Sequence, residues 1–265
     1  MHPIERLRYV ARARGVDAES LVVETASALR GMGLDPSELV VSCRRIVERH
    51  PACGPLWWLC ARTLTAADPA TALRAAVDEI GGDATARRLA EALPDDATVV
   101  VAGWAETVAD GLIRRGDARV LVVDADHAGT ALVRRLERSS VECDLVPAHA
   151  AALAVAGADV VMVEALALDA GVALVPIGSA VVAAAAALHG VPVSLAAGVG
   201  RSLPAAMMAA VRARTVDVAE LADAEVETIP LSVVATVHRP AGRVAQSRVT
   251  ADCELAPELL RPSPM

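Results

Sequence analysis

The sequence predicts an α/β protein in which a bundle of helices precedes a mostly parallel sheet that is flanked by further helices. Three observations predict this class. The first 93 residues hold amphipathic segments separated by short breaks, as in packed helical bundles. The run Thr98–Ala102 is continuous, apolar and β-branched, which is typical of a strand covered on both faces. Strand and helix patterns then alternate at the spacing of parallel βαβ units.

A change of character at Pro94-Asp95-Asp96 predicts two domains, a helical domain at 1–93 and a Rossmann-like α/β domain at 94–265. In the first domain, glycine and proline breaks separate six expected helices, and Asp17 or Ser20 caps the second one. These helices span residues 3–14, 17 or 20 to 30, 36–49, 56–65, 69 onward, and 84–93.

The second domain is expected to contain five strands joined by helices. The strands are residues 98–102, 119–123, 141–146, 158–163 and 191–196, and the helices follow Gly103 or span 129–138, 148–155 and 179–188. The apolar run 172–199 is interrupted by Pro176, Gly178 and Gly190. A buried strand–helix–strand unit therefore explains it better than a membrane span. The tail predicts a helix at 202–214, a strand at 229–237 and a short closing segment at 254–260.

Composition excludes several kinds of site. Lys, Asn and Phe are absent, which we attribute to the codon bias of a GC-rich, bacterial genome, and a phosphate must then bind Arg, backbone N–H groups or helix N-termini. A net charge of −8 argues against a nucleic-acid partner. Five cysteines without a CxxC pair fit a reducing cytoplasm. Neither metal-ligand spacing nor a GxGxxG fingerprint is present, so no metal and no cofactor are expected.

Acidic residues follow the strands at the edge where parallel sheets bind ligands. A carboxylate there could act as an acid or base, which makes Glu164, Asp124 and Asp126 the candidate catalytic residues. The alternative for Glu164 is a helix cap or a surface pair for Arg201. Trp104 follows Gly103 at a strand-to-helix turn and either packs into the core or contacts a ligand.

Four ordered segments resemble the initiation-factor-2B-like family, which includes the regulatory subunits of translation factor 2B and two sugar-phosphate isomerases, for methylthioribose 1-phosphate and ribose 1,5-bisphosphate. Residues 50–58 are similar to the family's Arg-Pro-Thr-Ala-x-Asn-Leu, and residues 99–108 to its Thr-His-Gly-Tyr-Ser-x-Thr-Val. Residues 120–129 resemble a strand that ends in Glu-Ser-Arg-Pro, and residues 158–179 resemble Gly-Ala-Asp followed by Asn-Lys-Ile-Gly-Thr.

The departures from this pattern identify a divergent member. The isomerases' cysteine falls at Gly103, and their aspartate falls at Ala165 or Leu166. The family's lysine falls at Pro176, and two of its arginines fall at Asp126 and His50. The resemblance therefore implies the scaffold without the residues that move protons and hold phosphate.

From these observations we expect a binding or regulatory protein that has lost the isomerase residues. The alternative is a sugar-phosphate-related isomerase or lyase-type enzyme with relocated acid and base residues, in which Glu164, Trp104 and Asp124 would converge on one pocket. The resemblance implies a homodimer formed through the C-terminal domain and a phosphorylated sugar or nucleotide as ligand. The candidate ligand-binding residues are His50, Gly103, Trp104, Glu106, Asp169 and Ser179.

Overall fold

The computed structural model describes residues 17–33, 35–125, 127–220 and 223–261. The helix predicted at 3–14 and the candidate residue Asp126 lie outside these ranges.

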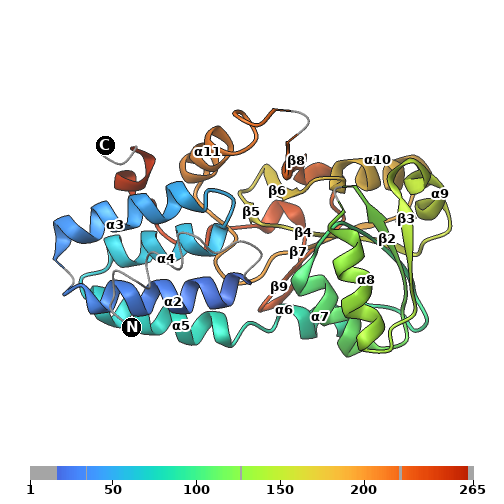
Figure 1. Cartoon of the computed structure of the whole chain (residues 1–265), viewed down its shortest axis with the longest axis horizontal. Coiled ribbons are helices and arrows are strands. Elements are labelled where there is room, and N and C mark those ends of the chain that lie inside the picture. Colours follow the sequence, from blue (N-terminus) through green and yellow to red (C-terminus); the bar gives the residue numbers. More distant parts are fainter. Residues whose placement is uncertain (1–16, 34, 126, 221–222, 262–265) are drawn as a thin grey trace.

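Four helices pack side by side at one end of the molecule (Figure 1). They are α2 (Ala18–Gly31), α3 (Pro36–Arg49), α4 (Gly54–Thr65) and α5 (Pro69–Gly81). Asp17, Asp35 and Asp68 each accept hydrogen bonds from backbone N–H groups in the first turn of α2, α3 and α5. These caps satisfy donors that a helix leaves open at its start, and they are the signals from which the helix starts were predicted.

The opposite end of the molecule is built on a sheet of seven strands in the order β10-β9-β7-β4-β1-β2-β3. Its parallel strands are β1 (Thr98–Ala102), β2 (Arg119–Asp124), β3 (Cys143–Pro147), β4 (Val160–Glu164), β7 (Val193–Ala196) and β9 (Thr236–Arg239). Only β10 (Gly242–Val244) is antiparallel to its neighbour. The predicted fold class is confirmed.

Helices cover both faces of this sheet. Val99 and Val101 of β1 share one apolar cluster with α6 (Thr85–Ala92), α7 (Glu106–Arg115) and α8 (Gly129–Arg138). Val100 and Ala102 point the other way, into a cluster with α9 (Ala151–Ala156) and α10 (Ser179–His189); a 3-10 turn, η1 (Ala148–Ala150), precedes α9. The alternation explains why the run is apolar at every position, since both faces of the strand are buried.

The expected strand at 229–237 is wrong, because this segment divides between two sheets. β8 (Val226–Pro230) pairs with β6 (Val172–Pro176), which pairs with β5 (Ala167–Leu168), in a small antiparallel sheet. A 3-10 turn, η2 (Leu231–Val233), then leads into β9 of the large sheet. Pro230 has no N–H group and ends β8, while the apolar pattern runs on through the turn and hides the break.

The last part of the chain returns to the helical end (Figure 1). Met207, Met208 and Val211 of α11 (Ala205–Arg214) and Leu259 of η4 (Pro257–Leu260) share the core of α2 to α5, and a further 3-10 turn, η3 (Gln246–Arg248), lies between them in sequence. The division at residue 93 stays a prediction. No helix in the part of the chain described is both long and apolar enough to cross a membrane.

Candidate functional site

A cleft of about 660 Å³ lies between the helical bundle and the carboxyl ends of the sheet strands. This volume is typical of sites for small molecules. Its polar lining residues include Asp17, Arg49, His50 and Cys53 from the bundle, Trp104, Glu106 and Glu164 from the sheet side, and Arg201, Arg214, Thr215, Asp223 and Glu225 from the tail.

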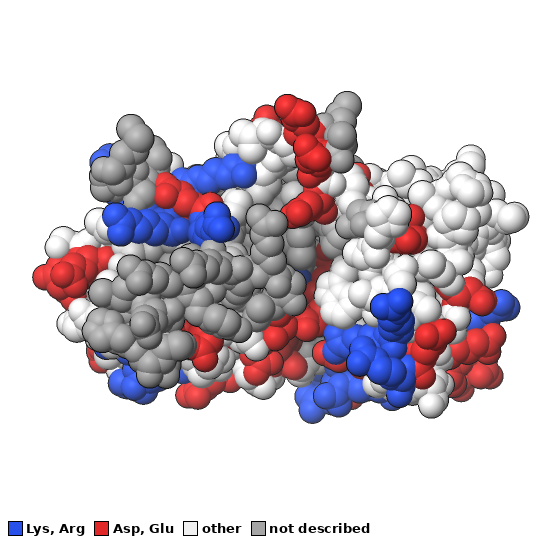
Figure 2. Space-filling view, in the orientation of Figure 1, with Lys and Arg blue, Asp and Glu red and all other residues white. Residues whose placement is uncertain are grey.

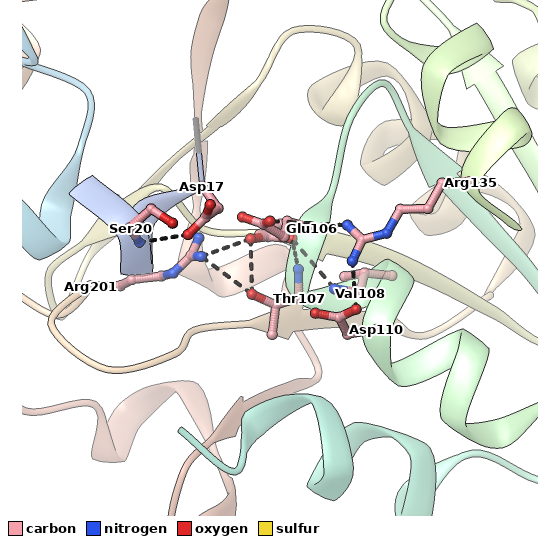
Figure 3. A network of polar contacts seen from close by, with 9 residues as sticks. Asp17, Ser20, Glu106, Thr107, Val108, Asp110, Arg135 and Arg201 are labelled. Carbon is pink, nitrogen blue, oxygen red and sulfur yellow. Dashed lines mark hydrogen bonds and ion pairs between the residues drawn. The ribbon is translucent and has the colours of Figure 1, made fainter. Parts of the chain in front are cut away.

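Glu164 ends strand β4 and is only 4% exposed. Its Oε2 accepts hydrogen bonds from the backbone N–H groups of Thr107 (2.8 Å) and Val108 (3.4 Å). Its Oε1 accepts from the Thr107 hydroxyl (3.0 Å) and forms an ion pair with Nη2 of Arg201 (2.8 Å). Ala105 at the N-cap of α7 has no side chain that could cap it. Glu164 therefore caps α7 from the neighbouring strand, and its pair with Arg201 is buried (Figure 3).

Arg201 is held by a glycine-rich loop that packs on the bundle. Its guanidinium donates to the carbonyl of Ala165 and to the Thr107 hydroxyl. Just before it, the Asp83 carboxylate accepts a hydrogen bond from the Val199 N–H (2.8 Å), and a Cβ at Gly198 would collide with that carboxylate.

Gly200 completes the same loop with φ +74°, and a Cβ there would lie 2.9 Å from the Trp58 ring. Glycine is required at this position both by the left-handed backbone and by the close approach to the ring. The position of Arg201 thus depends on contacts with α4 and with the segment that joins α5 to α6.

Two further carboxylates cap helices that follow strands. Oδ1 of Asp124 accepts from the N–H of Gly129, the first residue of α8 (3.1 Å). Oε1 of Glu227 accepts from the N–H of Ala180 in the first turn of α10 (2.9 Å). With Glu164 on α7, three helix N-termini are occupied by the protein's own carboxylates. Helix N-termini are the usual seats of phosphate groups in such folds, so these three are no longer free for a ligand.

Glu106, the first residue of α7, faces the cleft with a different environment. Its side chain is 30% exposed, and its nearest ion-pair partner is Arg135 at 4.0 Å. No described residue donates a hydrogen bond to its carboxylate. Burial, followed by the negative charges of Glu164 and Asp17, raises the pKa of Glu106 to about 7, although Arg135 and Arg201 oppose this shift.

Trp104 lies at the edge of the cleft and is 39% exposed. The guanidinium of Arg135 lies over its ring, 5.7 Å from the centroid, and also donates to Asp110 (2.6 Å). Of the two interpretations of Trp104, the structure therefore places it at the cleft and not in the core. Cys53, which faces the cleft from the start of α4, has its pKa raised by burial, which disfavours a thiolate.

The cleft thus brings together four of the predicted site residues, namely His50, Trp104, Glu106 and Glu164. Gly103, Asp124, Asp169 and Ser179 do not line it. Gly103 (φ +58°) turns the chain after β1, and Oδ1 of Asp169 accepts from the N–H groups of Gly171 and Val172 in the turn before β6. Ser179 is buried at the start of α10.

Sequence reasoning missed the roles of Thr107 and Arg135 and placed the Arg201 pair on the surface. The glycines before Arg201 were the available signal for a tightly packed loop. Within the described ranges, no group of three or more His, Cys, Asp or Glu side chains could hold a metal ion.

These features define an α/β protein with a helical front and a ligand-sized cleft at the strand ends. Comparison with solved structures gives the fold a name. Translation initiation factor eIF-2B of Pyrococcus horikoshii OT3 superposes with a TM-score of 0.77 over 94% of this chain and 98% of its own, at 16% identity. The beta subunit of eIF2B from Chaetomium thermophilum gives 0.67 over 93% and 89%, at 17% identity.

The tetrameric beta2-delta2 complex of eIF2B from C. thermophilum gives a TM-score of 0.70 at 18% identity, over 93% of this chain and 91% of that one. No protein-family model and no curated protein matches the sequence. The resemblance to the initiation-factor-2B-like family is therefore confirmed as a shared fold. Identities this low establish the fold and not the activity.

Proposed function

We propose that this chain is a ligand-binding, non-isomerase protein built on the fold of initiation factor 2B. The observation that carries the proposal is the state of Glu164. Both of its oxygens are engaged, by Thr107, Val108 and Arg201, in positions that hold α7 and the Arg201 loop. A carboxylate that is buried and bonded in this way stabilises the site and is poorly placed to abstract a substrate proton.

The occupied helix N-termini support the same proposal. A sugar phosphate needs anchors for its phosphate group, and this chain contains no lysine. Because Glu164, Asp124 and Glu227 fill three N-termini, phosphate binding would depend on arginines alone. We therefore propose that the cleft binds a molecule without relying on the phosphate anchors that the resemblance implies.

One observation favours the second candidate, an enzyme with relocated acid or base residues. Glu106 has a pKa of about 7 and faces the cleft, which suits a general acid or base. In that case the reactive carboxyl is Glu106, and Glu164 serves as its structural support.

A thermal-shift screen tests the binding proposal. The panel contains sugar phosphates, nucleotides, polyols and organic cations, and each stabilising compound is then followed by proton NMR for chemical change. We expect at least one compound to raise Tm by several degrees and to remain unaltered, and Trp104→Ala to remove the shift. Silence across the panel argues against a ligand-binding cleft. Conversion of a compound that Glu106→Gln abolishes favours the enzyme.

We also propose a homodimer that forms through the face of α9 and α10. Neither helix contains an Asp, Glu, Lys or Arg, yet Leu153 and Leu188 are 79% and 77% exposed. Figure 2 shows this side as a broad area without charge, over the position of α9, α10 and β3 in Figure 1. Apolar patches on helices of this kind are usually covered by a partner. The C. thermophilum eIF2B relative assembles as a tetrameric complex, which supports an oligomer.

Sedimentation equilibrium tests the dimer. We expect the wild type to sediment as a dimer and the variant Leu153→Glu with Leu188→Glu as a folded monomer. Val218→Glu is the matched control, because Val218 is 68% exposed and lies outside this face. A monomeric wild type, or a control that dissociates equally, contradicts the proposal.

A further inference from the structure

The charges around Glu106 are unbalanced. The groups that face it are Asp17 at the start of α2, Glu164 at the end of β4, Arg135 on α8 and Arg201 in the tail loop (Figure 3). On α7 itself, Asp110 pairs with Arg135 at 2.6 Å. Four carboxyl groups, counting Glu106, thus share two guanidinium groups.

Both guanidinium groups are already committed elsewhere. Arg201 lies 2.8 Å from Glu164 and also donates to the Thr107 hydroxyl and to a backbone carbonyl. Arg135 is closer to Asp110 than to Glu106, at 2.6 Å against 4.0 Å. A carboxylate accepts several hydrogen bonds when ionised, and Glu106 therefore has acceptor capacity that the described residues leave unused. A positively charged ligand would supply the missing donor.

Trp104 provides a second surface for a cation in the same place. It precedes Glu106 by two residues, lines the cleft, and its indole already attracts the guanidinium of Arg135. Organic cations bind where an aromatic face and a carboxylate lie together, because the ring quadrupole and the negative charge act in the same direction.

The entrance adds a longer-range contribution. Asp223 and Glu225 line the cleft from the segment that joins α11 to β8, and Figure 2 shows acidic side chains gathered over this segment. Arg49, His50 and Arg214 also line the cleft, but they come from the end of α3 and from α11, and they are not among the charges that act on Glu106. A cluster of like charge at a cleft concentrates ligands of the opposite sign.

We propose that this cleft binds a small organic cation, whose ammonium group lies between the Glu106 carboxylate and the Trp104 ring. The proposal rests on the proposed ligand-binding function and names its ligand class. Binding then depends on pH, since the cation prefers ionised Glu106. With the pKa of Glu106 at about 7, roughly a tenth of the protein has this group ionised at pH 6 and about nine tenths at pH 8.

Isothermal titration calorimetry with choline, a cation at every pH, tests the proposal. The matched probe is the uncharged isostere of choline in which carbon replaces the ammonium nitrogen, and a pentose phosphate serves as the anionic probe. We expect choline to bind at least tenfold more tightly than the isostere, and its affinity to rise about tenfold from pH 6 to pH 8.

Two variants separate Glu106 from other groups that titrate in this range, including His50. We expect Glu106→Gln to abolish the pH dependence and to weaken choline binding at pH 8 by about tenfold, while Trp104→Leu reduces the preference for choline over the isostere. Glu137→Gln, an exposed carboxyl on α8, is the control and should bind like the wild type. Circular dichroism checks that each variant is folded.

The outcomes distinguish this inference from the proposed function. Equal binding of choline and its isostere, or an affinity that does not change with pH, overturns the organic-cation ligand. If only the pentose phosphate binds, the cation proposal is overturned while ligand binding stands. If choline binds and is chemically altered, the cation site stands while the non-isomerase, binding-only function is contradicted.

Discussion

The replacement Glu164→Gln probes the structural role of the strand-end carboxylate. Glutamine preserves the shape of the side chain but removes its charge, and its amide nitrogen cannot accept a hydrogen bond. The variant weakens the cap on α7, a loss of about 0.5 to 2 kcal/mol in typical helices. It also leaves Arg201 buried without its ion-pair partner, and removing one member of a buried pair costs about 3 to 5 kcal/mol. Because the two effects share Thr107, we expect a combined loss of about 4 kcal/mol.

Urea denaturation at neutral pH, followed by circular dichroism, measures this loss. Glu142→Gln is the matched control, since Glu142 pairs with Arg119 at 3.4 Å on the surface, and it should change the free energy of unfolding by less than about 1 kcal/mol. In the double variant Glu164→Gln with Arg201→Met, we expect part of the stability to return because no buried charge is left unpaired. A loss below about 1 kcal/mol for Glu164→Gln would refute the reasoning.

Two further predictions concern stability. Folding raises the pKa of Glu106 from 4.5 to about 7, so the wild type loses stability as pH rises through this window; Glu106→Gln should therefore be more stable than the wild type by about 1 to 2 kcal/mol at pH 8, after allowance for partial exposure, and nearly equal at pH 4, as measured by urea denaturation. Gly200→Ala combines a left-handed backbone with a collision against Trp58 and should cost about 3 kcal/mol, whereas Gly190→Ala, with φ +70° and open space around it, should cost about 1 kcal/mol; equal losses in thermal unfolding would contradict the packing of this loop.

Local signals made much of the fold predictable. Asp35 followed by Pro36 and Asp68 followed by Pro69 are start signals that act within one turn, and both helices begin where they were expected. The run 98–102 is apolar on both faces, which fixes β1 at the centre of a covered sheet. In contrast, the assignment of β8 and β9 to different sheets depends on pairing with β6 and β7, far apart in sequence, and a single apolar run cannot encode that choice.

The candidate site was only partly predictable, because one sequence signal serves two purposes. A carboxylate just after a parallel strand can face a ligand or cap the next helix, and the sequence around Glu164 and Asp124 does not distinguish these roles. The choice for Glu164 depends on Ala105, which leaves α7 without a local cap, and on Arg201, which the loop at 198–200 brings to the site from a distant segment. The absence of a capping residue before a helix, as at Ala105, is the clue that a sequence offers.

The most direct test of the central claim, that Glu164 supports the cleft and does not perform isomerase chemistry, is a turnover measurement by phosphorus and proton NMR. The two aldose phosphates of the isomerases, methylthioribose 1-phosphate and ribose 1,5-bisphosphate, are incubated with the wild type at substrate-like protein concentrations. The account predicts that neither is converted to its ketose, while the folded protein remains able to bind choline. Formation of either ketose by the wild type, and its loss in folded Glu164→Gln protein, would contradict the account.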